Sequence, residues 1–393
     1  MASHGIARSA RRELSASEKA KEQKQISQYQ SLVAQVQDLY RQKDYSSSSL
    51  QLTTALLSQN PEFYTIWNYR RQILSSVFSA ELSAPARPAS PSHAPDAEAL
   101  TSAQREISLL IREDLTFLLP LQKFNPKVYW LWNHREWLLG QASAHLPITT
   151  ARQFWREELG LVEKMLGRDE RNFHGWGYRR EVVSALEELR YRELVAEKEK
   201  DSERELGEEI RTGMRREASL AKQEFEYADR MVRSNLSNFS AWHHRLRQIY
   251  RLLEGKGDTD DARREMFDAE LELVTEGLWV CTGPKDQSLW FYHLDLMATL
   301  DPDAREEFRI LKGINDQERR GYVEKQTEAI KEILEDNEDC KWVYQALLDL
   351  AQLCKRIGGQ ADDEEMRNWL DQLEKLDPLR KLRWLDLRKK LSL

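Results

Sequence analysis

The stretch NPKVYWLWNHREWLL, from Asn125 to Leu139, places aromatic and basic side chains between an Asn-Pro pair and two leucines. Taken alone, it fits either a ligand site or a packing element. Other segments of the chain align with it on a tryptophan, which stands at Trp67, Trp132, Trp176, Trp242, Trp290 and, in a weak copy, Trp342. The stretch is therefore one copy of an internal repeat, and the repeat decides the fold.

Two further positions recur around the tryptophan. In the first four copies an aromatic residue precedes the tryptophan by three positions, and an arginine follows it by three. The aromatic residues are Tyr64, Tyr129, Phe173 and Phe239, and the arginines are Arg70, Arg135, Arg179 and Arg245. The fifth copy has Gln287 and His293 instead, so the pattern weakens toward the C-terminus. Spacings of three place these side chains on one face of a helix.

Each motif follows a second amphipathic segment, such as 47–59 before the first copy and 223–234 before the fourth. An Asn-Pro or similar polar junction separates the two segments, because proline cannot continue the first helix. Alternating runs typical of strands are absent from the sequence. A single helix pair cannot bury its apolar face, whereas stacked pairs can. We therefore predict an all-α fold, a right-handed α-α superhelix or solenoid of helical hairpins.

Unequal spacing between the tryptophans indicates insertions. Successive tryptophans are 65, 44, 66 and 48 residues apart, and the long intervals contain unusual composition. Residues 79–100 are rich in Pro, Ala and Ser, which is typical of a surface loop. Residues 187–217 are dense in Glu, Lys and Arg, which indicates solvated helices that extend beyond the repeats. We predict an N-terminal arm at 1–26 and a solenoid at 27–393.

Composition argues against several classes of function. The 393 residues include 59 basic and 66 acidic side chains, so a nucleic-acid partner is not expected. The three cysteines, Cys281, Cys340 and Cys354, form no CxxC pair, which suits a reducing compartment. The sequence shows neither a secretory signal nor 18 consecutive apolar residues. These features predict a cytoplasmic protein without stable membrane insertion.

Motifs of common enzymes are missing from the sequence. It has no phosphate-binding glycine loop and no HExxH pair. His243 and His244 are adjacent, so on a helix they point about 100° apart and cannot readily share a metal ion. The repeating tryptophans are best read as packing residues between helix pairs. The arginines either pair with carboxylates of the next repeat or line a surface for an acidic partner, and the spacing leaves both alternatives open.

The unit [ND]-x-x-[YF]-x-x-W-x-x-R resembles the repeat of protein prenyltransferase α subunits over roughly residues 45–345. Tetratricopeptide repeats fit less well, because their tryptophan opens the first helix of a pair and this one lies on the second. The resemblance implies a crescent of helical hairpins that forms a heterodimer with a β subunit. In that family the β subunit carries the zinc and most of the active site, so this chain would bind no metal or cofactor itself.

Three features are similar to the branch of the family that modifies Rab GTPases. They are His4-Gly5 before a charged first helix, the C-terminal segment 376–391, and Trp130 after Tyr129, where the CaaX-reading branch has glutamine. This branch is a protein geranylgeranyltransferase type II, active only with its β subunit. It transfers geranylgeranyl from geranylgeranyl diphosphate to C-terminal cysteines of Rab GTPases that an escort protein presents. Unlike the animal members of this branch, the chain is expected to have no leucine-rich or sandwich-like extension.

Two alternatives remain open at this point. One is the α subunit that farnesyltransferase and type I geranylgeranyltransferase share. The other is a helical-repeat scaffold without an enzymatic partner. Copurification with a β subunit would indicate one of the transferases, and an additional escort protein would indicate the Rab-modifying enzyme.

The resemblance also implies which side chains face the reaction. Lys127 and Tyr129 match the family's Lys-x-Tyr, which extends toward the isoprenoid diphosphate. Negative charge grows on the diphosphate as its C–O bond breaks, so an ammonium and a phenol donor stabilise the transition state more than the ground state. His174 occupies the matching place in the next motif. His4, on the N-terminal arm, is a candidate transient ligand of the β-subunit zinc, which keeps an open coordination position.

Overall fold

The computed structural model describes residues 15–85, 100–200, 206–255, 259–280 and 287–393. Every long regular element in these ranges is a helix, so the all-α prediction is confirmed. The chain divides into two compact units, Met1–Ala218 and Ser219–Leu393. Among the described helices, none combines the length and the apolar content that a membrane span requires.

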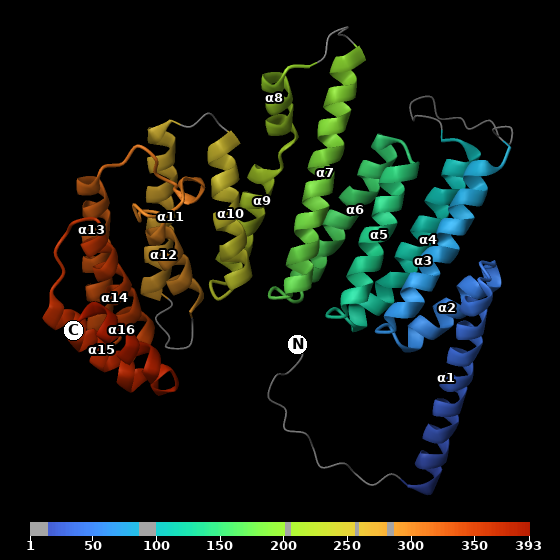
Figure 1. The fold of residues 1–393 in the computed structure, drawn as a ribbon, viewed down its shortest axis with the longest axis horizontal. Helices are drawn as coiled ribbons and strands as arrows, with labels where there is room; N and C mark the ends of the chain where they lie inside the picture. The colour runs from blue at the N-terminus through green and yellow to red at the C-terminus, as the bar shows by residue number, and fades with distance from the viewer. Residues whose placement is uncertain (1–14, 86–99, 201–205, 256–258, 281–286) are drawn as a thin grey trace. The chain divides into compact units, whose positions relative to one another are not determined.

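In the first unit, neighbouring helices lie side by side and alternate in direction (Figure 1). Its helices are α1 (Ala16–Gln42), α2 (Ser47–Gln59), α3 (Tyr64–Ser83), α4 (Ser102–Phe124), α5 (Tyr129–His145), α6 (Ile148–Leu166), α7 (Phe173–Lys200) and α8 (Glu208–Ala218). The pairs α2/α3, α4/α5 and α6/α7 form hairpins, and each hairpin packs on the next through α3/α4 and α5/α6. The hairpins coincide with the sequence repeats.

The second unit continues the same pattern. Its helices are α9 (Ala221–Ser234), α10 (Phe239–Gly255), α11 (Asp260–Val280), α12 (Ser288–Ala298), η1 (Glu306–Phe308), α13 (Asp316–Glu335), α14 (Lys341–Arg356), α15 (Asp363–Leu376), η2 (Pro378–Arg380) and α16 (Lys381–Leu391). Hairpins form from α9/α10, α11/α12 and α13/α14, while α15 packs on α14 and α16 packs on α15. The second helices α10, α12 and α14 also contact one another in order.

The repeated tryptophan closes the turn of its own hairpin. In the first hairpin, α2 ends at Gln59, and the indole N–H of Trp67 donates to the carbonyl of Pro61. The same bond to the carbonyl six residues earlier, at 2.8 to 2.9 Å, forms at Trp67, Trp132, Trp176 and Trp242. All four side chains are buried. The tryptophan therefore packs between helices and also satisfies a turn carbonyl that the helix leaves without a partner.

The repeated arginine reaches the first helix of the next hairpin. The buried pairs are Arg70 Nε to Asp114 Oδ1 at 2.8 Å, Arg135 Nε to Glu158 Oε1 at 2.6 Å, and Arg245 Nη2 to Glu270 Oε1 at 2.6 Å. These contacts decide between the two sequence alternatives in favour of carboxylates in the next repeat. They are charge-assisted and nearly free of water, so each holds two neighbouring hairpins in register.

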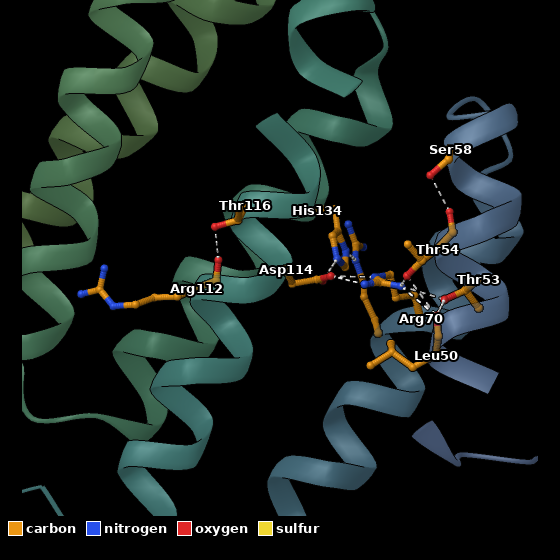
Figure 2. A network of polar contacts seen from close by, with 10 residues as sticks. Leu50, Thr53, Thr54, Ser58, Arg70, Arg112, Asp114, Thr116 and His134 are labelled. Carbon is orange, nitrogen blue, oxygen red and sulfur yellow. Dashed lines mark hydrogen bonds and ion pairs between the residues drawn. The ribbon is translucent and has the colours of Figure 1, made fainter. Parts of the chain in front are cut away.

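In two of these three pairs, a second side chain holds the carboxylate from within its own hairpin. Figure 2 shows the cluster at Asp114, where the His134 Nε2 atom lies 2.7 Å from the second carboxylate oxygen. Burial alone would raise the pKa of Asp114, but the hydrogen bond from His134 and the charge of Arg70 outweigh it and lower that pKa to about 2. In the second unit Tyr292 donates to Glu270 in the same way. Each of these two carboxylates therefore accepts hydrogen bonds from two neighbouring repeats.

The last repeats lose parts of this pattern. In the fifth copy His293 takes the place of the arginine, and its Nε2 atom lies 2.9 Å from Gln326 Oε1 on α13. The indole N–H groups of Trp290 and Trp342 have no hydrogen-bond partner among the residues that the structure describes. The weakening seen in the sequence thus corresponds to lost hydrogen bonds, while the buried packing of both rings remains.

The two insertions differ in what the structure describes of them. Residues 86–99 lie outside the described ranges, so the surface-loop prediction stays a prediction there. In the second insertion α7 continues to Lys200 and α8 follows, with a small apolar core formed by Tyr191, Leu194, Val195, Met214 and Ala218. At the N-terminus α1 already begins at Ala16, and residues 15–28 are exposed, so the boundary at residue 26 also stays a prediction.

Candidate functional site

The aromatic residues that open the second helices face away from the core. Whereas the tryptophan of each repeat is buried, the aromatic side chain one turn earlier is exposed: 55% for Tyr64, 53% for Tyr129, 71% for Phe173 and 44% for Phe239. Exposed aromatic side chains at equivalent places of successive repeats indicate a surface that another molecule covers.

The three candidate residues lie at the same end of hairpins α4/α5 and α6/α7. Lys127 is in the turn before α5, Tyr129 begins α5, and His174 follows the first residue of α7. The rings of Tyr129 and His174 are 5.9 Å apart, between centroids. The Lys127 side chain is 54% exposed, and its Nζ atom lies 3.8 Å from a carboxylate oxygen of Asp169, in the turn before α7. The structure therefore brings an ammonium, a phenol and an imidazole to one exposed surface.

Asn172, which the sequence analysis missed, joins the two turns that carry these residues. Its side-chain oxygen accepts the backbone N–H groups of His174 at 3.1 Å and Gly175 at 3.3 Å. Its amide nitrogen donates to the carbonyl of Pro126 at 3.0 Å, the same carbonyl that accepts the Trp132 indole. The turn of Lys127 is thus fixed to the turn of His174. The signal in the sequence was an asparagine four residues before the tryptophan, which recurs at Asn238.

Trp130 supports the same surface from the side of the preceding repeat. The side chain is half-buried, with its ring centroid 5.4 Å from that of Tyr64 and 5.6 Å from that of Tyr129. The Trp130 ring therefore contacts an aromatic ring of each of the two hairpins. The rings of Tyr64, Trp130 and Tyr129 form a continuous row between the two hairpins.

Charge and burial determine what the surface can bind. Burial lowers the pKa of His174, so its imidazole is neutral at physiological pH and offers a hydrogen bond without a charge. The long Lys127–Asp169 pair is exposed, and such pairs contribute only about 0–1 kcal/mol. An incoming phosphate group could therefore compete for the ammonium at little cost. The arrangement suits an anion that needs one charged donor and one or two neutral donors.

Metal binding in this chain is not indicated by the described residues. Among them, no three His, Cys, Asp or Glu side chains are grouped as a metal site would require. Cys340 and Cys354 are buried as free thiols, and burial raises the pKa of each. His4 lies outside the described residues.

Comparison with known proteins places this geometry in a family. The model described as "Protein prenyltransferase alpha subunit repeat" matches residues 46–77, 111–142, 155–186 and 221–252. The geranylgeranyl transferase type-2 subunit alpha of Saccharomyces cerevisiae is 32% identical over 391 residues, covering 98% of each chain. This chain belongs to that family. The Schizosaccharomyces pombe protein of the same name is 32% identical, covering 95% of this chain and 93% of the relative.

Membership of the type-2 α-subunit family confirms the resemblance seen in the motif. The human protein of that name matches over 276 residues at 30% identity, which is 70% of this chain and 38% of the human one. Among solved structures, a chain of the Candida albicans protein geranylgeranyltransferase-I complexed with GGPP has a TM-score of 0.56, with 20% identity over 92% of this chain and 89% of that one. That likeness shows a shared fold. The type-2 names favour the Rab-modifying branch over both alternatives.

Proposed function

We propose that this chain is the α subunit of a heterodimeric Rab geranylgeranyltransferase. The heterodimer would transfer geranylgeranyl from its diphosphate to C-terminal cysteines of Rab GTPases that an escort protein presents. The similarity to the yeast type-2 subunits along nearly the whole chain carries the proposal. The exposed group at Lys127, Tyr129 and His174 supports it, because those residues lie within the matched repeats.

In this proposal the chain acts on the leaving group. As the thiolate sulfur bonds to the first carbon of the isoprenoid, the C–O bond breaks and the electron pair leaves with the diphosphate. The Lys127 ammonium would bind the phosphate oxygens, and the Tyr129 hydroxyl would donate a hydrogen bond to them. The neutral His174 imidazole would donate a further one. These interactions are strongest when the charge is most developed, so they lower the barrier rather than only bind the substrate.

The β subunit supplies what this chain does not. A zinc ion held there would lower the pKa of the acceptor cysteine and keep it as a thiolate. The packed turns around Asn172 would hold Lys127 and His174 in place when the two subunits associate, so that their side chains need little reordering. The division assigns nucleophile activation to the β subunit and part of the leaving-group stabilisation to this chain.

Coexpression with candidate β subunits tests the proposal. The purified heterodimer is assayed with geranylgeranyl diphosphate on a Rab GTPase with escort protein, and in parallel on CaaX peptides. We expect transfer to the Rab protein alone. Transfer to CaaX peptides would indicate the shared α subunit of the other branch, and failure to bind any β subunit would indicate a scaffold.

Recognition of the Rab protein is assigned to the escort protein, which we expect to dock on the outer face of the crescent that the family resemblance implies. In a pull-down with the heterodimer, Rab capture should require the escort protein. Tight capture of the Rab protein alone would contradict this assignment.

His4 has a separate, regulatory role in the proposal. A histidine on the N-terminal arm could occupy the open position of the zinc and be displaced by substrate. Deletion of residues 1–10 should leave the heterodimer intact and leave the apparent affinity for substrate equal or better. Loss of assembly would show instead that the segment is structural.

A further inference from the structure

A cleft of about 590 Å³ opens in the second unit, beside the exposed side of α10. It exists because α12 stops at Ala298 after 11 residues, whereas α10 has 17. The chain then leaves the repeat pattern, and residues 304–308 form the opposite wall of the cleft. The volume lies in the range of sites that hold a ligand or a short segment of another protein.

The walls of the cleft offer apolar contact. Leu246 and Tyr250 contribute from α10, Ala298 from the end of α12, and Phe308 from η1. The Tyr250 and Phe308 rings meet edge to face, with centroids 6.1 Å apart, and Phe308 remains 44% exposed. An aromatic ring held in place but left open to water is a favourable contact for an incoming apolar side chain.

Two charged residues of the cleft lack an oppositely charged partner among the residues that the structure describes. Arg247 and Asp295 line it, and within the described residues neither makes a hydrogen bond or an ion pair. Elsewhere in this unit comparable groups are paired, as with Arg233 and Asp229 at 2.9 Å. Asp295 remains exposed, and the desolvation of its carboxyl by the surrounding atoms raises its pKa. A ligand with a cation at this point would form an ion pair with Asp295 that the described residues do not supply.

The cleft is continuous with the surface that the repeats leave exposed. His243 lines it, and the His243 ring lies 6.3 Å from that of Phe239, the exposed aromatic residue that opens α10. Phe239 in turn contacts Phe291, the neighbour of Trp290 on α12. Phe239 is the repeat equivalent of Tyr129, which belongs to the candidate site in the first unit. Within the second unit, a partner that covers Phe239 at the start of α10 is therefore also the partner that reaches the cleft.

We propose that this cleft receives a segment of the β subunit, with an apolar side chain between Leu246 and Phe308 and a basic side chain opposite Asp295. The inference rests on the proposed function, because it takes the β subunit as the partner. It adds an anchoring point in the second unit, formed by residues other than those assigned to the diphosphate. Arg247, at the rim, would pair with an acidic group of the same segment.

Charge reversal tests the anchoring point. The dissociation constant between the full chain and the β subunit is measured for Asp295→Lys and Phe308→Ser. Matched controls are Glu272→Lys, an exposed acidic residue of α11, and Leu82→Ser, an exposed leucine of α3. We expect each cleft variant to weaken binding at least tenfold and each control to change it less than twofold. Transfer at saturating subunit concentration should stay within twofold of the wild type, because the cleft touches no reacting group.

Three results would overturn the inference. The first is wild-type affinity in both cleft variants. The second is a lower melting temperature of the free chain with unchanged affinity, which would assign Asp295 to the fold. The third is that the wild-type chain self-associates and that Phe308→Ser abolishes this self-association without changing the binding of the β subunit. That result would show that the cleft binds a second copy of this chain. A wild-type chain that binds no β subunit would instead remove the proposed function itself.

Discussion

Tyr129 and Trp132 stand one helical turn apart, yet they serve different purposes. The tryptophan is buried and donates its N–H to the turn carbonyl of Pro126, whereas the tyrosine is exposed beside His174. Sequence spacing could predict that both lie on one side of the helix, but not which of them stays exposed. That distinction depends on the neighbouring hairpins, which enclose one ring and leave the other accessible.

Lys127 offers the most direct test at this scale. In Lys127→Ala, single-turnover transfer by the heterodimer at saturating lipid diphosphate should slow by roughly 30- to 160-fold. This is the lower half of the about 2–4 kcal/mol that one transition-state contact contributes, because basic groups on the β subunit would share the charge. Thermal stability should hold, since the exposed pair with Asp169 contributes little. Trp132→Ala is the control, with a loss of about 3–5 kcal/mol in folding. An unchanged chemical step would remove Lys127 from the site.

His293 predicts a specific response to acid. Burial lowers its pKa to about 4, below the value of about 6.5 in an unfolded chain. As the pH falls below 6.5, the unfolded chain takes up a proton that the folded chain does not, so stability decreases until about pH 4. Between pH 7.0 and 5.5 we expect this residue to account for about 1 kcal/mol of lost stability. In urea unfolding, the free energy of unfolding of His293→Gln should therefore fall by about 1 kcal/mol less over this pH range than that of the wild type. An equal fall in both proteins would contradict the lowered pKa of His293.

At the scale of helices, the clamped carboxylates are the connections between hairpins. Asp114 on α4 joins α3 through Arg70 and α5 through His134 (Figure 2). Removal of one partner from a buried pair leaves the other charge without compensation, which costs about 3–5 kcal/mol. We therefore expect Asp114→Asn to lower the free energy of unfolding by about that amount in urea titrations.

Glu157 on α6 provides the matched control for Asp114. It pairs with Arg112 at 2.9 Å, but both side chains are 46% exposed. Glu157→Gln makes the same chemical change in water, and we expect a loss of only about 0–1 kcal/mol. Similar losses in the two variants would mean that the buried pair does not connect the hairpins.

Sequence patterns predicted the helices well and their connections only in part. Trp67 and its equivalents predicted the hairpins because burial and helical spacing are local properties. The partner of Arg70 was not predictable, because Asp114 is one of 66 acidic residues and lies 44 positions away in the chain. The cleft beside α10 was not predictable either, since it depends on where α12 ends. For Lys127 and Tyr129 the family motif gave the positions, and the structure gave their common surface.

For the whole molecule, the proposed division of labour predicts how metal and activity distribute between subunits. The purified chain alone should contain no stoichiometric zinc and transfer no prenyl group, whereas the heterodimer should contain about one zinc ion and be active. Metal analysis of both preparations, with a transfer assay beside each, checks this. About one tightly held zinc ion per isolated chain would contradict the assignment of the metal to the β subunit.

The hydrogen bond of the repeated tryptophan and the ion pair of the repeated arginine also constrain how the array of hairpins can evolve. The tryptophan bond lies within one hairpin, so a duplicated hairpin brings its own closed turn. The arginine bond crosses to the next hairpin, where Glu270 stands 20 residues before Trp290, and Asp114 and Glu158 each stand 18 residues before the tryptophan of their own repeat. An inserted copy is therefore stable only if the preceding hairpin supplies an arginine for its carboxylate and the following hairpin supplies a carboxylate for its arginine. A substitution at one of these two positions requires a matching substitution at the other. The first hairpin follows no other repeat, and it has the uncharged, buried Ser49 at this position.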